Sequence, residues 1–599
     1  MEEQEPESRP QLRRQSRAKA CDVCRRRKVR CDRERPCANC VRNEEPQSCT
    51  YQAGSRRRNR RLPSAPGARE RLAALANLER RMQTIAEEVT IQGQAQTLQA
   101  QSSSISERCL PNLRLSPGQH PRSDQTGSQG FIGAESLAAT LINVLKAISP
   151  SNSSFASGSN GEILESPNQD FAELLCMTDT GVTHPFASLW APGASVKDVC
   201  LALPDDQSFD LYLSHFFDVA HLLPSAPPVD FQKEARHFRQ AMSIDYRNKD
   251  ANRSAGWLAV LFSVLACGCS LVPISTERSD LNSRVFVCST FQLLRLDNYL
   301  LNPRMDHVRA LSFLSGCLRY HANPDASWKL LGLTIRLAQS LGLHCAAPPR
   351  EDSSPRESEA WALWQGLLWD DTILSLCYDR PCNTWNAGFV PRIARLTETG
   401  LSFIECCHGQ AMIMNDIQHE RARSQRTRLE VSEVLFEAAE EQIMLYEASA
   451  QEHLRDRCTC KDDRQRAEHD VFQIFTTYFL FHLRRQHIAS QEKSSNTSMS
   501  DGDEICIERC QSILEAYLRL RTYAQYATKL WTLVHILLSC AFFLATNTNL
   551  NADNSSLPLL QDLCHTYEQS IKYSSSSHPH YVTILQTLQG VSGIIQPLR

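Results

Sequence analysis

Residues 21–49 read CDVCRRRKVRCDRERPCANCVRNEEPQSC, a stretch in which six cysteines follow the pattern C-x2-C-x6-C-x5-C-x2-C-x8-C. Each C-x2-C pair can bind one metal ion from a tight turn, because the two intervening residues let both thiolates face the same point. A closed structural zinc site takes four ligands, so two zinc ions require eight ligand bonds, and six cysteines supply eight only if two of them bridge. We therefore expect two zinc ions bound by Cys21, Cys24, Cys31, Cys37, Cys40 and Cys49.

The residues around these cysteines indicate a structural rather than a catalytic zinc site. No histidine occurs in residues 1–61, which excludes the zinc fingers and RING-type sites that use histidine. A site closed by cysteines has no open position for water or substrate. Val23, Val29 and Val41 are nearly all of the apolar core of this segment, so metal binding must supply most of its folding free energy.

Positive charge is concentrated in the same part of the chain. Residues 9–61 contain 18 Lys and Arg against 5 Asp and Glu, whereas the 599-residue chain has a net charge of −3. A basic head on an acidic body predicts a polyanionic partner for the head alone. A short helix between the second and third cysteines would present a dense positive face to phosphates, and Arg or Lys can also read O6 and N7 of guanine. The DNA-binding candidates are Arg25, Arg26, Arg27, Lys28 and Arg30, and a merely solvated run of charge is the alternative.

On these motifs, the segment resembles the fungal Zn(2)-C6 binuclear cluster family of transcription factors. The cysteine spacing, the basic run and Pro36 directly before the fourth cysteine fit that family. The resemblance implies that Cys21 and Cys37 bridge the two zinc ions and that Pro36 shapes the loop between the half-motifs. Cys24 and Cys31 would complete one zinc site, and Cys40 and Cys49 the other.

The resemblance also implies a function. Members of the family read CGG triplets in the major groove of double-stranded DNA, and Arg27 and Lys28 best match the reading positions, with Arg25, Arg26 and Arg30 on phosphates. The expected protein is a nuclear RNA polymerase II transcription factor that acts with the transcription machinery. As a family tendency, it would regulate a fungal biosynthetic (secondary metabolite) gene cluster or a metabolic pathway. The alternative is a zinc-stabilised co-regulator that binds protein without reading DNA.

The segment after the cysteines predicts a linker and then a dimerisation helix. Residues 1–20 are a basic flexible terminus, and residues 50–67 are a basic linker whose arginine run, 56–61, suits phosphate contacts or nuclear import. Residues 68–92 form a short coiled coil, because their apolar positions follow a 3-4-3-4 spacing. A single amphipathic helix that packs on something else is the other interpretation. The seam that would make a homodimer, and so pair two triplets, consists of Leu75, Leu78, Met82, Ile85 and Val89.

The remaining sequence predicts a disordered linker and one large regulatory domain. Residues 93–170 are mostly rich in Gln, Ser, Gly and Pro, which bury too little apolar surface to fold. From 171 to 597 apolar runs with helical periodicity recur and strand patterns are scarce, so the fold class is mostly α. The expected helices are Leu211–Leu222, Leu258–Leu271, Ser283–Leu301, Asp306–Tyr320, Trp328–Leu341, Ala360–Leu376, Leu429–Ala448, Val471–Arg485, Ile505–Leu520 and Lys529–Thr546.

This helical region also resembles a family domain. The stretches LYLSHFFDVAHLLPSAPPVDF (211–231), ASWKLLGLTIRLAQSLGLHC (326–345) and SEAWALWQGLLWDDTILSLCYDRP (358–381) are similar to the middle homology region of fungal transcription factors. That region regulates activity rather than performing chemistry. The family often has Gly before Arg-Pro, where this chain has Asp379. Asp325, directly before the second stretch, is expected to cap the helix there, and Gly342 to end it in the left-handed conformation.

The sequence favours neither an enzyme nor a membrane protein. It contains no HExxH, G-x-S-x-G, P-loop or G-x-G-x-x-G motif, and Asp370 and Asp371 are expected to be structural. The terminus lacks a secretory signal, so the eighteen cysteines outside the cluster are expected to be reduced, buried and apolar in character. Two apolar runs, Gly256–Pro273 and Leu530–Ala545, are short for membrane spans and are expected to be buried helices.

Overall fold

A computed structural model describes residues 20–27, 29–43, 46–49, 72–84, 185–223, 227–228, 230–244, 253–272, 277–321, 323–350, 352–384, 400–427, 433–491, 501–547 and 556–573. They fall in two compact units, a head within Met1–Gly67 and a body within Ala68–Arg599. The predicted disordered linker, 93–170, lies outside the described residues.

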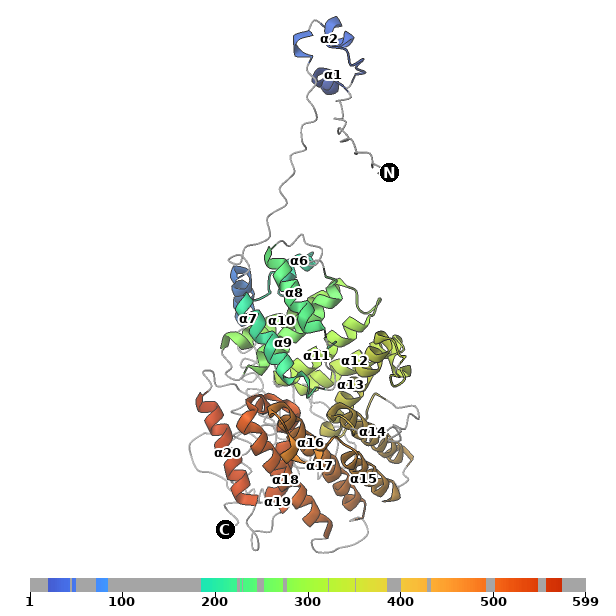
Figure 1. Ribbon diagram of the computed structural model, residues 1–599, viewed down its shortest axis with the longest axis vertical. Helices are drawn as coiled ribbons and strands as arrows, with labels where there is room; N and C mark the ends of the chain where they lie inside the picture. The colour runs from blue at the N-terminus through green and yellow to red at the C-terminus, as the bar shows by residue number, and fades with distance from the viewer. Residues whose placement is uncertain are drawn as a thin grey trace, which may run out of the picture. The chain divides into compact units, whose positions relative to one another are not determined.

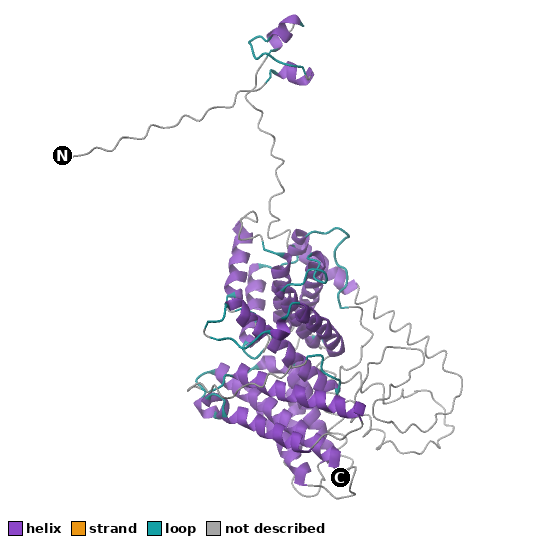
Figure 2. Cartoon of the chain, turned by 90° about the vertical axis from the view of Figure 1, so that its right-hand side faces the viewer, coloured by secondary structure: helices purple, strands orange, loops and turns teal. Residues whose placement is uncertain are grey.

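All named elements in the described residues are helices, which confirms the mostly α fold (Figure 2). A single parallel bridge between Leu401 and Ala450 is the one extended pairing recorded there. The head contains α1 (Asp22–Arg27), α2 (Ala38–Arg42) and the 3-10 turn η1 (Pro46–Ser48). The body contains α6 (Val196–Cys200), α7 (Asp206–Ala220), α8 (Phe231–Ile244), α9 (Ala255–Leu271), α10 (Glu277–Leu296), α11 (Met305–Tyr320), α12 (Pro324–Ser340), η3 (Leu343–Cys345), α13 (Pro355–Tyr378), α14 (Phe403–Thr427), α15 (Glu433–Ala448), α16 (Glu452–Arg455), η4 (Arg457–Thr459), α17 (Asp463–Gln491), α18 (Asp501–Tyr523), η5 (Gln525–Lys529), α19 (Trp531–Asn547) and α20 (Ser556–Tyr573).

Helix α9 is the centre of the first half of the body (Figure 1). Ser254 caps it by accepting the N–H of Trp257 at 3.1 Å, and nearly all of its residues are buried. Helices α7, α10 and α11 pack around it. Gly268 allows the close approach of α7, because a Cβ at this position would lie 2.0 Å from the backbone oxygen of Tyr212. This all-round burial explains why the α9 sequence is apolar without a polar face.

The second half of the body is built from α14 to α20, with α13 between the halves (Figure 1). Helix α17 packs on α18, and α18 packs on α19. Helix α19, like α9, is buried along most of its length, which confirms that both apolar runs are core helices. None of the described helices is long and apolar enough to cross a membrane. Most of the described cysteines of the body are also buried, as expected.

The turn after α13 forms with aspartate in place of glycine. Asp379 adopts φ 49°, and its N–H donates to Leu376 O at 3.2 Å, so it ends the helix as glycine would. Its carboxylate accepts a hydrogen bond from Arg421 Nη1 at 3.0 Å, which stabilises this left-handed residue. Gly342 also adopts the predicted left-handed conformation, with φ 75°.

The predicted capping role of Asp325 is wrong. Helix α12 begins at Pro324, after Asn323, so Asp325 lies inside its first turn. The Asp325 carboxylate instead accepts from the buried Arg380 guanidinium at 2.7 Å and pairs with Lys329 at 2.6 Å. The physical reason is that a buried guanidinium without a counter-charge is costly, so the Asp325 carboxylate pairs with Arg380 instead of capping the helix.

The two other carboxylates singled out in the sequence are structural. Asp370 accepts a hydrogen bond from Arg319 Nη2 at 3.0 Å. Asp371 accepts from the N–H groups of Asn383 and Thr384 and from the Thr384 hydroxyl, at 2.6 to 2.7 Å. The Asp371 carboxylate thereby holds the backbone at Asn383 and Thr384, after the end of α13, in place.

Buried His535 predicts a loss of stability in acid. The side chain is 3% exposed and stacks on Trp531, and burial lowers the pKa of His535 to about 4. In the unfolded chain, histidine binds a proton below its ordinary pKa of about 6.5, whereas the buried side chain of the folded protein stays neutral. The free energy of unfolding is therefore at its full value above pH 6.5 and decreases as the pH falls toward 4. Between pH 7 and pH 5 this one group is expected to cost about 2 kcal/mol.

Urea unfolding at both pH values measures this cost. His535→Phe is expected to lose less stability on acidification than the wild type, whereas the same change at the exposed His344 leaves the wild-type loss. Equal losses in wild type and H535F would show that His535 is not the responsible group.

Candidate metal centre and nucleic-acid interface

The head is built from two similar half-motifs. Each begins with a cysteine directly before a short helix, Cys21 before α1 and Cys37 before α2. The backbone N–H of Cys21 donates to Cys31 Sγ at 3.5 Å, and that of Cys37 donates to Cys49 Sγ at 3.2 Å. The last cysteine of each half thus folds back onto the first cysteine of the same half.

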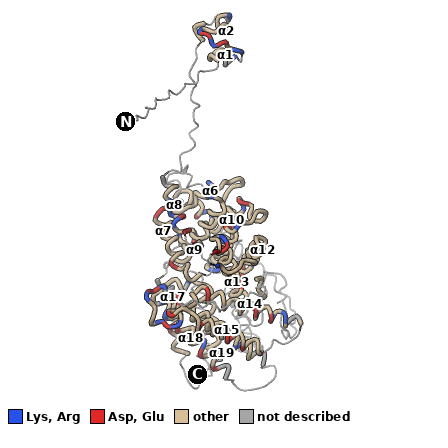
Figure 3. The backbone as a smooth tube through the Cα atoms, turned by 45° about the vertical axis from the view of Figure 1, so that its right-hand side comes forward, with Lys and Arg blue, Asp and Glu red and all other residues tan. Residues whose placement is uncertain are grey.

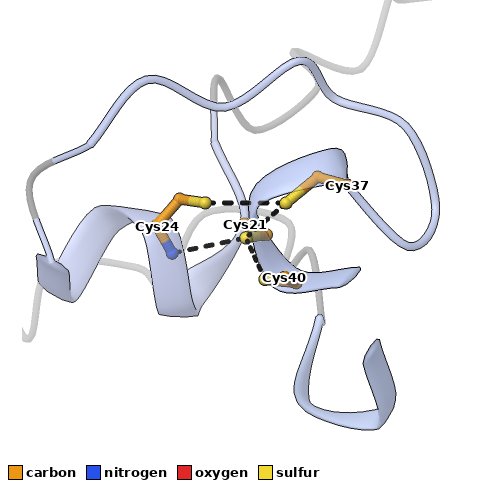
Figure 4. A group of neighbouring side chains, drawn as sticks. All are labelled: Cys21, Cys24, Cys37 and Cys40. Carbon is orange, nitrogen blue, oxygen red and sulfur yellow. Dashed lines mark hydrogen bonds between the residues drawn. The ribbon is translucent and has the colours of Figure 1, made fainter. Parts of the chain in front are cut away.

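Four of the six sulfurs meet at the centre of the head (Figure 4). The Sγ atoms of Cys21, Cys24, Cys37 and Cys40 all lie within 4.8 Å of one another. The Cys21–Cys37 distance is 3.8 Å, Cys21–Cys40 is 3.7 Å and Cys24–Cys37 is 3.5 Å. Two sulfurs that share a tetrahedral zinc ion, each about 2.3 Å from it, lie about 3.8 Å apart. The sulfur separations therefore fit ligands that share zinc.

Cys21 and Cys37 are the central pair of this group. They contact each other, and each also contacts one thiol of the opposite half, Cys21 with Cys40 and Cys37 with Cys24 (Figure 4). Both side chains are 0% exposed, whereas Cys31 and Cys49 are half-buried at the edge of the group. Two bridging ligands would occupy this central position.

Without metal, three of the four central thiols resist ionisation. Burial disfavours the Cys21 thiolate, but hydrogen bonds from the Cys24 N–H and from the neighbouring thiols outweigh it and lower the pKa of Cys21 to about 6. Burial and the neighbouring sulfurs of Cys21 and Cys37 raise the pKa of Cys24 to about 12. Burial also raises the pKa of Cys37 and of Cys40. Dications are the groups that can hold so many thiolates at one point, so the donor set suits zinc.

The apolar core of the head is smaller than the sequence suggested. Val23 is 4% exposed, but Val29 and Val41 are 46% and 53% exposed, so the prediction that all three form a core is wrong. The cysteines take the interior in their place, since the buried cluster consists of Val23 and four cysteines. Metal binding must therefore supply even more of the folding free energy.

Two polar residues that sequence reasoning missed shape the loop between the half-motifs. Asp32 accepts the N–H of Ala38, the first residue of α2, at 2.7 Å, and that of Glu34 at 3.1 Å. Asn39 Nδ2 donates to Arg30 O at 2.6 Å, which ties α2 to the basic segment after α1. Pro36 follows a cis peptide bond in this loop. Acidic and amide residues in a metal-binding loop signal such backbone contacts only weakly in sequence.

Basic residues surround both short helices of the head (Figure 3). Arg27 and Arg30 are exposed, as a phosphate- or base-contacting residue must be. The side chains of Arg25 and Arg26, and all of Lys28, lie outside the described residues. The structure adds Arg33, Arg35 and Arg42 as exposed cations that the sequence analysis did not select.

Of the predicted dimer seam, the structure describes the part on helix 72–84. Leu75, Leu78 and Met82 are 1%, 7% and 5% exposed, and all three belong to the hydrophobic core of the body. Ile85 and Val89 lie outside the described residues. Residues 72–84 thus form a single amphipathic helix that packs on another part of the protein. This is the second of the two interpretations of the pattern.

Comparison with known domains agrees with both parts of this architecture. Residues 19–58 match the fungal Zn(2)-Cys(6) binuclear cluster domain, which binds two zinc ions. Residues 213–386 match the fungal specific transcription factor domain, and this range runs from within α7 to just beyond α13. The head match contains all six clustered cysteines and the basic run.

Curated relatives are transcription regulators. The Fusarisetin A cluster transcription factor fsa6 of Fusarium sp. (strain FN080326) is 25% identical over 57% of this chain and 46% of its own length. The acetamidase regulatory protein of Aspergillus fumigatus is 25% identical over 54% of this chain and 40% of its own. The transcription factor lepE of Aspergillus flavus is 58% identical over 36 residues, 6% of this chain and 4% of its own length. The chain thus spans less than half the length of these relatives, which are regulators and not enzymes.

Proposed function

Because this chain is a fungal transcription regulator of the Zn(2)-C6 binuclear cluster family, we propose that it is a nuclear RNA polymerase II factor that reads CGG-type half-sites. The observation that supports this most directly is a buried group of thiols, with sulfur separations suited to zinc, in a head that also exposes several arginines. Zinc supplies the fixed centre, and the chain's own basic side chains supply the contacts to DNA.

The ligand roles follow from the contacts of the central pair. We assign Cys21 and Cys37 as bridging ligands, because each contacts a thiol of the opposite half. Cys24 and Cys31 then complete one zinc site, and Cys40 and Cys49 the other. This division also matches the backbone contacts, in which Cys31 returns to Cys21 and Cys49 to Cys37.

The DNA-reading roles rest on position in the basic run. Arg27 and Lys28 lie at the end of α1 and directly after it, where they can reach O6 and N7 of guanine. Arg25, Arg26 and Arg30 neutralise phosphates, which gives affinity without sequence information. One triplet specifies little, so a homodimer through the seam on residues 68–92 pairs two of them. The bound factor then acts on the transcription machinery.

The regulated genes are proposed to be a biosynthetic gene cluster or a metabolic pathway. The name of the fsa6 relative refers to a gene cluster, and that of another relative refers to acetamidase. Both are distant, so they support the class of target and not its identity. Mapping the bound sites across the genome, together with expression profiling after deletion of the gene, tests this assignment.

Two substitutions in the basic run separate base reading from phosphate binding. Lys28→Ala is expected to weaken binding to a CGG duplex by about 1–3 kcal/mol and to reduce discrimination against a scrambled duplex. Arg30→Ala is expected to weaken both duplexes alike and to lower the slope of log affinity against log salt by about 1. Fluorescence anisotropy on the full chain at several salt concentrations measures both effects.

Two outcomes would contradict these assignments. If K28A weakens binding to both duplexes equally, Lys28 is not a reading residue. If the wild-type chain shows no salt-dependent binding to CGG, the protein-binding co-regulator is favoured.

A further inference from the structure

Helix 72–84 makes its apolar contacts with the body of its own chain. Leu75, Leu78 and Met82, which lie on one face of this helix, are almost completely buried in the same core that contains α7, α9 and α10. The opposite face, with Asn77, Arg80 and Gln83, is exposed. The apolar face therefore seats the helix on the body, and Figure 1 shows it as the blue ribbon beside α7.

Polar contacts hold the helix at both sides of this stripe. Glu79 Oε1 accepts from Arg278 Nε of α10 at 3.4 Å, and the Glu79 side chain is only 13% exposed. Arg81 donates through Nη1 to Leu189 O and through Nη2, at 3.5 Å, to Ser188 O. These contacts join residues more than 100 positions apart in sequence, so they fix a tertiary position and not a local turn.

The same apolar side chains cannot serve two partners at once. A coiled coil with a second copy would use Leu75, Leu78 and Met82 as its first seam residues, and the body already covers them. Seating on the body and pairing with a second copy are therefore mutually exclusive states of one helix.

We propose that the body masks the dimerisation helix by binding residues 72–84, and that paired-site recognition requires release of this helix. The proposal rests on the proposed function, because it concerns how the DNA-binding dimer is controlled. In the masked state the chain presents a single zinc head. In the released state the stripe is free to pair with that of a second chain, which brings two heads together.

The polar contacts allow the masked state to be weakened without changing the coiled coil. In the heptad that places Leu75 at a and Leu78 at d, Glu79 is at e and Arg81 at g. In a parallel dimer, the partners of these positions on the second helix would be Ala74 and Ala86. Neither charge can therefore make an ion pair across the dimer, and both are used only in the masked state.

Arg278→Glu in the full chain tests the proposal. Its side chain is 62% exposed, so the change places like charges beside Glu79 without disturbing the core. Sedimentation velocity over a concentration series is expected to show dimerisation about five- to tenfold tighter than in the wild type. Binding to a DNA with two CGG sites is expected to tighten relative to a DNA with one site. Arg81→Ala added to R278E is expected to increase both effects.

Matched variants complete the experiment. Arg295→Glu reverses a charge at another exposed position of α10 and is expected to leave dimerisation unchanged. The double variant Glu79→Arg, Arg278→Glu restores the ion pair with its charges exchanged, and its dimerisation is expected to return to the wild-type level. The idea is overturned if R278E, alone and with R81A, dimerises no better than R295E, or if the exchange fails to reverse the effect. Sedimentation measures dimerisation without DNA. Failure of the wild type to bind a DNA with a single CGG site would instead contradict the proposed function.

Discussion

Replacing Cys37 with serine is expected to remove both zinc ions from the head and to reduce binding of CGG-containing DNA to the nonspecific level, on the order of a thousandfold below the wild type. Cys37 is fully buried and contacts both Cys21 and Cys24 at 3.5 to 3.8 Å. In its proposed bridging role it would belong to both metal sites, so its loss would leave neither with four thiolates. Among the described residues of the head, Val23 is the one buried apolar side chain besides the cysteines, so little apolar packing holds the head together without metal.

Zinc content per chain measures the effect and separates the ligand roles. The wild type is expected to bind two zinc ions, C37S fewer than one, and Cys49→Ser about one, since Cys49 belongs to a single site. Cys345→Ser is the matched control, because Cys345 is an exposed cysteine of the body. Retention of two zinc ions by C37S would show that Cys37 does not bridge, and the assignment of the central pair would have to be abandoned.

The metal centre could be predicted from sequence because its geometry is encoded in short spacings. A C-x2-C pair brings two thiolates together in any chain that forms a tight turn, so no long-range information is needed. The contacts of Asp32 and Asn39 could not be predicted in this way, because they depend on how the loop returns to α2 and to Arg30. The exposed positions of Val29 and Val41 were missed for a related reason, since the sulfurs and not the valines fill the interior.

In the body, most of the long helices were predicted, and buried polar side chains explain one that was not. All ten predicted helices overlap observed ones, but α8, α14 and α20 and the short α6 and α16 were not predicted. Helix α14 buries Gln410, Asn415 and Gln418, which interrupt the apolar periodicity. Gln410 Nε2 donates to Thr476 at 2.8 Å, and Asn415 Nδ2 donates to Thr372 and Thr384 at 3.1 Å, so partners distant in sequence bind the amide nitrogens of these two residues.

The seam on residues 68–92 shows a different limit of sequence patterns. A 3-4-3-4 spacing identifies an apolar stripe, and burial of Leu75 confirms that the stripe is used. The spacing carries no information about which surface covers it, because a second copy and the body of the same chain offer the same kind of contact. Only the tertiary contacts of Glu79 and Arg81 distinguish the two partners.

Arg380→Ala is expected to destabilise the body by about 3–5 kcal/mol, the largest loss from a single substitution outside the metal centre. Arg380 is 4% exposed and donates to Asp325 at 2.7 Å. Its guanidinium also lies 4.2 Å from the ring centre of Tyr378 and 4.7 Å from that of Trp328. Removing it leaves the buried Asp325 carboxylate with Lys329 as its remaining cationic partner and opens a cavity between α12 and the end of α13.

Urea unfolding of the full chain, followed by circular dichroism, measures this loss. Arg336→Ala, at an exposed arginine of α12, is the matched control and is expected to change stability by less than about 0.5 kcal/mol. A double variant, Arg380→Met with Asp325→Asn, removes the buried carboxylate that R380A deprives of its guanidinium while keeping most of the volume, so it is expected to be more stable than R380A alone. If the double variant is no more stable than R380A, the loss comes from the cavity and the aromatic contacts. If R380A loses less than about 1 kcal/mol, this buried ion pair does not hold the junction of α12 and α13 together.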